Sequence, residues 1–433
     1  MIKPSFHHYH KRFEQRLGFL KIITVVGKDA RGGSVEILSR LKRLYEKPLS
    51  NMPSSRSIFN PEELISREDI PSWTVGFQAS SLDQLISWAS NLGIIAPTGR
   101  LSEWSIILER LMTHHDKALW EDENPFLLSV EEKAYFLQLL FYHDQVMPIL
   151  MSYLAKETPW KSLSLNDSCL IVIRAIGDLL DVIKGIGPDE MKVRLRLHDV
   201  LERIGKQYGL KNPRLLFSKE SRLQLLADLQ MMKNRGVRKF LAENHTVCRF
   251  EQLTDLGLLL KENPNIPARS IKERKDIRQA WSWCITPSLC GARKFLTDHF
   301  TDVETFLLKY WMQFCSILYK PDAKHLDIFS AQLDIASYLD EALPLARRQI
   351  GPVQLHTWAS LTCIRAFSAN KIIEIYDVSE LLMSMHRHPK LGSLIRIGGQ
   401  GDLRGRTIAV ANKSIYSMLK EHPLAREEYN DKK

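Results

Sequence analysis

Apolar residues recur at helical spacing over most of this sequence, and this pattern restricts the chain to a mainly helical fold. From Leu127 to Leu154 they form an amphipathic segment that opens with the capping-box pattern Ser129-x-x-Glu132. A second helical segment runs from Leu163 to Leu201 and is interrupted by a Gly-Ile-Gly-Pro break at 185–188. We therefore expect a mainly α fold with small β-hairpins.

The first 45 residues follow the pattern of a strand, a glycine loop and a helix. Phe19–Val26 is rich in β-branched residues, whereas Val35–Tyr45 has apolar residues at helical spacing. A loop in this place can hold a phosphate at the N-terminus of the following helix. Residues 27–34 lack the Walker spacing, so we expect turn chemistry here rather than a nucleotide site.

The C-terminal part of the chain combines helices with a glycine-rich hairpin. Glycine suits such a loop because a tight hairpin requires positive φ angles. The expected elements are, in order, a helix over Gln354–Ser368, a strand over Ile372–Tyr376, a helix capped by Asp377 and ended by Pro389, strands Leu394–Ile397 and Arg406–Val410 around the loop at 398–405, and a last helix capped by Asn412.

This order of elements resembles the winged-helix DNA-binding proteins over roughly Pro352–Leu419. It departs from their pattern because the second helix of the usual triad is absent, or fused with the third between Asp377 and Pro389. The resemblance implies a recognition helix in the major groove and a hairpin that enters the minor groove or bridges phosphates. The helix would offer Ser379, Ser384, His386 and Arg387 to the bases or backbone.

Two earlier segments share a related pattern, a helix that ends at Leu-Gly and leads into an apolar run. One ends at Leu92-Gly93 and the other at Leu256-Gly257. Both are similar to the middle of a winged helix, although the first could also be an ordinary helical hairpin. We expect a shared type of module here rather than a repeat of fixed period.

Positive charge is concentrated in two parts of the chain. The net charge is +10, and Met191–Phe240 holds thirteen Lys and Arg residues against four acidic ones. Such a field attracts nucleic acid, although a solvated helix face or a contact with an acidic protein would also explain it. The candidate nucleic-acid-binding residues are Arg194, Arg196, Lys233, Arg235, Arg238 and Lys239 here, and Arg387, Lys390, Arg396, Arg404, Arg406 and Lys413 in the C-terminal module.

No catalytic motif is present, and we predict no catalytic residue, no metal and no cofactor. The histidines at positions 7, 8 and 10 lie at a terminus that we expect to fray. His114, His115 and Asp116 are adjacent, so on a helix they cannot all face one ion. Trp281 and Trp283 would share a face on a strand and could stack bases, but we expect them at helical core or interface positions.

The composition is that of a globular protein inside the cell. Hydrophobic residues make up 44% of the chain and charged residues 25%. The start of the sequence lacks a signal peptide, and no apolar run is long enough to span a membrane. The six cysteines are scattered, as expected of reduced thiols that mostly lie in the core. We expect a cytoplasmic or nucleoid-associated protein.

Five regions follow from these patterns. They are residues 1–46, a strand-loop-helix; 72–155, a winged-helix-like module; 156–275, a basic helical region with a second winged-helix-like segment; 276–350, a helical linker or bundle; and 351–433, the C-terminal winged-helix module.

The function that we expect is non-catalytic binding of nucleic acid, DNA rather than RNA and double-stranded. Basic helices and the Gly/Arg hairpin would make the contacts, in a bacterial DNA-processing or anti-phage defence complex with a protein partner or in a homo-oligomer. The alternative is a scaffold or dimerisation subunit whose winged helices contact protein. A third hypothesis is a nuclease whose acidic residues the sequence does not reveal.

Overall fold

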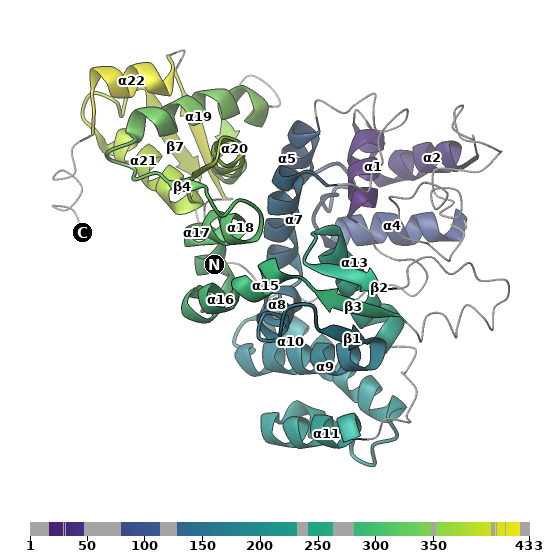
Figure 1. Cartoon of the computed structure of the whole chain (residues 1–433). Coiled ribbons are helices and arrows are strands. Elements are labelled where there is room, and N and C mark those ends of the chain that lie inside the picture. The colour runs from purple at the N-terminus through teal and green to yellow at the C-terminus, as the bar shows by residue number, and fades with distance from the viewer. Residues whose placement is uncertain are drawn as a thin grey trace.

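The structure is a computed structural model that describes residues 17–28, 30, 32–46, 79–112, 128–231, 241–262, 281–347, 352–399, 403, 405–411 and 413–424. Most of these residues lie in helices, and the strands are short and form small sheets (Figure 1). The prediction of a mainly helical fold with small β-hairpins is confirmed. Within the described ranges, no helix has both the length and the apolar character needed to cross a membrane.

An N-terminal group of helices packs against the centre of the molecule (Figure 1). The group consists of α1 (Gly18–Gly27), α2 (Gly33–Glu46), α4 (Ala79–Asn91) and α5 (Glu103–Leu111). The strand predicted at Phe19–Val26 is wrong, because this segment forms α1. Nearly every residue of α1 is buried, so its β-branched side chains fill a helical core and packing outweighs strand propensity.

Both Leu-Gly segments end a helix as predicted. Gly93 follows α4 with φ 74°, and Gly257 follows α13 (Val247–Asp255) with φ 72°. The chain then behaves differently in the two places. After Gly93 it makes a tight turn with a single bridge between Ile95 and Leu101, whereas after Gly257 it continues as a strand of a sheet.

The middle of the chain forms a unit of helices around a three-stranded antiparallel sheet. The predicted capping box at Ser129 and Glu132 is present at the start of α7, and the predicted break falls between α9 and α10. The elements are α7 (Val130–His143), α8 (Val146–Leu154), β1 (Ser162–Ser164), α9 (Leu165–Val182), α10 (Pro188–Gln207), the 3-10 helix η1 (Pro213–Phe217), α11 (Lys219–Met231), a π-helical turn η2 (Ala242–Thr246), α13, β2 (Leu259–Glu262) and β3 (Ser282–Ile285).

Strand β3 corrects two expectations about its residues. The region 276–350, expected as a helical linker or bundle, has its first described helix only from Pro287, because Cys284 pairs with Ser162 and Leu260 in the sheet. Trp281 and Trp283 are buried core residues as expected, but Trp283 lies on the strand and Trp281 just before it, not on a helix. Short helices follow, which are α15 (Pro287–Gly291), α16 (Arg293–His299), α17 (Val303–Lys309) and α18 (Trp311–Tyr319).

The C-terminal unit packs three helices against a second three-stranded antiparallel sheet. Its elements are β4 (Lys324–His325), α19 (Gln332–Ala346), β5 (Val353–Gln354), α20 (Leu355–Ser368), β6 (Lys371–Ile372), α21 (Ile375–Arg387), β7 (Ile395–Gly399), β8 (Arg406–Val410) and α22 (Ile415–Glu421). The strand predicted at Ile372–Tyr376 is wrong beyond Ile372, because Ile375 already begins α21. Glu374, not Asp377, occupies the N-cap position, and Ser414 caps α22.

The middle and C-terminal units share one order of elements. In each, a helix precedes a short strand that runs directly into a second helix, and a later helix leads into two more strands. These are α8, β1, α9, α13, β2 and β3 in one unit, and α19, β5, α20, α21, β7 and β8 in the other. The last strand lies in the centre of each sheet, antiparallel to both neighbours. The middle unit differs by the insertion of α10, η1 and α11 between its second and third helices.

Candidate nucleic-acid interface

The N-terminal end of α21 is fixed inside the protein by Glu374. The carboxylate of this residue accepts hydrogen bonds from the backbone N–H groups of Met312 (2.9 Å) and Gln313 (2.7 Å), at the start of α18. The backbone N–H of Glu374 in turn donates to Asp377 (3.2 Å). Burial raises the pKa of Glu374 to about 8, although the two backbone donors favour the charged form. This end of α21 therefore faces protein.

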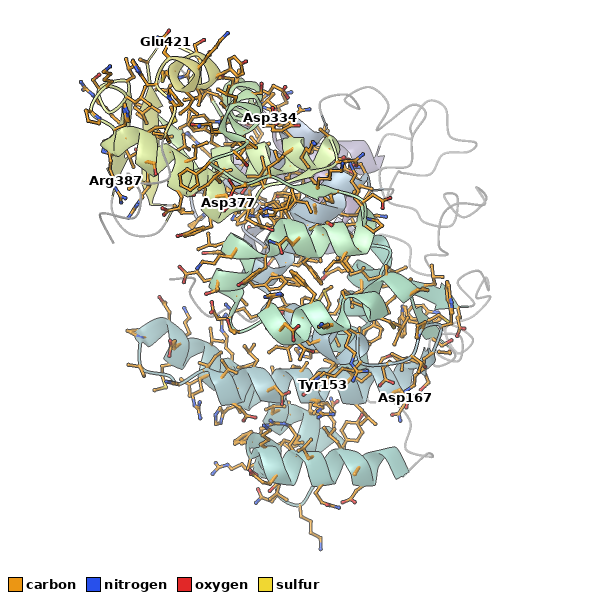
Figure 2. The ribbon with its side chains drawn as sticks, turned by 60° about the vertical axis from the view of Figure 1, so that its left-hand side comes forward. Tyr153, Asp167, Asp334, Asp377, Arg387 and Glu421 are labelled. Carbon is orange, nitrogen blue, oxygen red and sulfur yellow. The ribbon has the colours of Figure 1, made fainter. Side chains whose placement is uncertain are left out.

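Two of the polar side chains expected to read DNA on α21 serve the fold instead. Ser379 is buried, and its hydroxyl donates to the carbonyl of Ile375 (2.7 Å). Nδ1 of His386 lies 2.8 Å from the carbonyl oxygen of Ile395, which ties α21 to β7. Arg387, the last residue of α21, is exposed, and Figure 2 shows it at the outer edge of the C-terminal unit. Ser384 is half-buried, so of the four residues expected to contact DNA only Arg387, at the C-terminal end of the helix, is exposed.

The strands β7 and β8 place their arginines on opposite faces of the sheet. Successive residues of a strand alternate between faces, and directly paired residues share one. Arg396 pairs with Ala409 on the outer face and is exposed. Arg406 pairs with Gly399 on the inner face, where a guanidinium nitrogen lies 3.9 Å from the sulfur of Met383 on α21. The structure therefore does not join Arg396 and Arg406 into one cluster.

Two lysines complete the described candidates in this unit. Lys390 is exposed in the turn between α21 and β7. Lys413 lies before α22 and forms a partly exposed ion pair with Glu421 (Nζ–Oε2 2.5 Å). Arg404 lies outside the described residues. The exposed basic residues thus run from the end of α21 into β7, as Arg387, Lys390 and Arg396.

The basic segment Met191–Phe240 contributes less than its charge suggests. Arg194 on α10 donates hydrogen bonds to the carbonyls of Leu180 and Ile183, so it caps the end of α9. Arg196, also on α10, is exposed. Lys233, Arg235, Arg238 and Lys239 lie outside the described residues.

In the middle unit, the helix equivalent to α21 is covered by protein. Almost every residue of α13 is buried. Arg249 on this helix makes two hydrogen bonds to the carboxylate of Asp144 (2.9 and 3.0 Å), and neither side chain is exposed to solvent. The backbone N–H of Leu17, just before α1, donates to Asp255 at the end of α13 (2.7 Å). This helix cannot enter a groove of DNA in the arrangement described.

The sequence pattern did not identify Glu374 as the cap of α21 or β5 as a strand. Only Glu374 belongs to a recognisable sequence motif. The Glu374-x-x-Asp377 pattern is a capping box of the kind that begins a helix, so it marks the true start of α21. Strand β5 has two residues and no distinctive composition. In the described part of the chain, no three His, Cys, Asp or Glu side chains could jointly hold a metal ion. The histidines at 7, 8 and 10 and the His114–Asp116 group lie outside it.

Comparison with known proteins identifies no relative. The sequence matches no protein-family model, no curated protein and no solved structure.

Proposed function

We propose that the C-terminal unit is a winged-helix module that binds double-stranded DNA. The order helix, strand, helix, helix and two strands supports this proposal, because α19, α20 and α21 supply three helices where the sequence pattern accounts for only two. The first strand of the module is β5 rather than the segment near Ile372, and it pairs with β8. The wing is then the β7–β8 hairpin.

The observation that carries the proposal is the exposure of three basic residues that follow one another in the sequence from the end of α21 into β7, Arg387, Lys390 and Arg396. These side chains follow one another from the end of α21 through a turn to the outer face of β7. Exposed long cationic side chains neutralise phosphates and position a protein on the duplex without reading its sequence. Because the N-terminal end of α21 is buried, we expect backbone contacts to dominate over base contacts.

Fluorescence anisotropy with a short duplex over a salt series tests this function. We compare the wild type with the triple variant Arg387→Ala/Lys390→Ala/Arg396→Ala. The matched control, Lys161→Ala/Arg293→Ala/Lys294→Ala, removes three exposed charges outside the C-terminal unit. The slope of log K against log salt should flatten by about 0.9 for each phosphate that the first variant no longer neutralises, and it should stay unchanged in the control. Equal behaviour of the two variants, or no binding by the wild type at low salt, would refute the proposal.

A second candidate function, protein–protein contact through the units, is favoured by the burial of α13. In the middle unit, the helix in the recognition position packs against the chain itself, so a surface of this kind is already used for a contact with protein. If the wild type fails to bind DNA, the corresponding surface of α21 and β7 becomes the place to look for a partner.

A further inference from the structure

The face of α10 that points away from α9 carries exposed apolar side chains. The opposite face is buried through Val193, Leu197 and Leu201. Four large apolar residues from the end of α9 to the first half of α10 are exposed: Ile186 (83%), Val182 (70%), Leu195 (62%) and Met191 (46%). Folded chains seldom expose this many large apolar side chains within one short stretch without a partner for them. In Figure 1, α9, α10 and α11 form one end of the molecule.

Charges of both signs flank this apolar surface along α10. Lys192 precedes Leu195 by three residues and Asp199 follows it by four, and both are exposed. At about 100° per residue, Lys192 and Asp199 lie to the same side of Leu195 when the helix is viewed end-on. Lys192 lies toward the N-terminal end of the helix and Asp199 toward its C-terminal end. Exposed Arg196 and Arg203 lie on this side too, at about 100° and 80° from Leu195, so the charges on this side nearest to Leu195 in angle are Lys192 (about 60°) toward one end and Asp199 (about 40°) toward the other.

We propose that α10 pairs with α10 of a second copy of this chain, antiparallel and crossing at Leu195, to form a homodimer. In such a pair the two-fold axis reverses the helix direction, so Leu195 meets its own equivalent. Lys192 then faces Asp199 of the partner subunit, and the same contact occurs again on the other side of the axis. A partner of uniformly acidic or basic charge would oppose one member of each pair, whereas a second copy satisfies both.

The area of the α10 surface determines how tightly we expect the two copies to associate. Helix α10 has 20 residues and is therefore about 30 Å long. One helix pair with the adjoining turn buries an area at the low end of specific interfaces, below about 1,200 Å² in total. The dimer should therefore be reversible and should form as the protein concentration rises. The proposal is independent of DNA binding and is tested without DNA.

Sedimentation equilibrium of the full chain over a range of concentrations tests this dimer. Leu195→Glu should make the protein monomeric, because it places two like charges at the axis. The matched control Val35→Glu, on α2, introduces the same charge at an equally exposed apolar residue (76% exposed) and should leave the association unchanged.

A charge exchange distinguishes this pairing from any other interface. Lys192→Glu alone and Asp199→Lys alone should each weaken self-association at least tenfold, because like charges then face each other twice. An equimolar mixture of the two variants should recover dimers, since every facing pair is again of opposite sign. A wild type that stays monomeric at all concentrations, or a dimer that ignores Leu195→Glu and the charge exchange, would overturn the proposal.

Discussion

Gly177 on α9 lies against the guanidinium group of Arg222, which α11 inserts into the surface of α9. The side chain of Arg222 is fully buried. It forms ion pairs with Asp178 (3.3 Å) and Asp181 and donates to the carbonyl of Leu216 (3.2 Å). A Cβ at position 177 would overlap this group. The absence of a side chain at one residue thus allows α11 to dock.

Gly177→Ala should destabilise the docking of α11 by about 1–3 kcal/mol, because the added methyl group displaces a buried, ion-paired cation. The midpoint of urea unfolding measures the effect. Gly291→Ala is the matched control, since no atom lies within 4 Å of a Cβ built there. If both variants unfold at the wild-type midpoint, Arg222 can move without loss and the interpretation is wrong.

Glu374 should make the stability of the protein depend on pH. Burial raises its pKa from 4.5 to about 8 in the folded protein, so the folded state retains a proton that the unfolded chain releases. Its contribution to the free energy of unfolding is therefore complete below pH 4.5. The contribution falls as the pH rises toward 8, by at most about 1.4 kcal/mol per pH unit.

Glu374→Gln imitates the protonated form and should remove this dependence. We expect wild type and variant to differ least in urea unfolding at acidic pH, with the wild type losing stability relative to the variant up to about pH 8. A difference between the two that stays constant over that range would show that Glu374 does not titrate there.

At the scale of elements, the hairpin of β7 and β8 depends on one glycine. Gly399 has φ 89°, and a Cβ there would overlap the carbonyl oxygen of Gly405. Its neighbour Gly398 has room for a Cβ, with Oγ1 of Thr407 3.6 Å away as the nearest atom. The positive φ that the glycine-rich sequence indicates is thus required at Gly399 and not at Gly398.

Gly399→Ala should therefore loosen the hairpin at a cost of about 1–2 kcal/mol, whereas Gly398→Ala should not. Hydrogen exchange of the backbone amides in β7 and β8 measures this, with faster exchange expected only in the first variant. The same variant should bind DNA more weakly, since Arg396 lies on the loosened strand. Equal exchange rates in both variants would contradict the role given to Gly399.

The elements that the sequence predicts well are those whose signals are local. The capping box at Ser129 and the glycine after each Leu-Gly helix depend on neighbouring residues only, and both are present. Phe19–Val26 misled because β-branched residues also suit a helix that is buried on nearly all sides. In the candidate site, Arg387, Lys390 and Arg396 are exposed. The hydrogen-bond contacts of Ser379 with Ile375 and of His386 with Ile395 could not be predicted, because they depend on how α21 packs in the fold and not on neighbouring residues in the sequence.

At the scale of the whole molecule, the chain contains two units of one topology in different surroundings. From the sequence, the segments around Gly93 and Gly257 are expected to form the same type of module. In the structure, the order of elements and the strand order are instead shared by the middle unit and the C-terminal unit. This match is not visible in the sequence, because strands of two to five residues are too short to show a period and because α10–α11 is inserted in only one unit. The middle unit buries its third helix, α13. The C-terminal unit exposes the end of its third helix, α21, which precedes strand β7 with the exposed Arg396.

The central claim is that DNA contacts the C-terminal unit at the end of α21 and at β7. Hydrogen–deuterium exchange of the full chain with and without a saturating duplex tests it most directly. Protection should gather over residues 387–399 and 406–410, with no change over α13, whose surface is already covered. Protection over α10 with none over the C-terminal hairpin would contradict the account and transfer the binding surface to the basic segment of the middle unit.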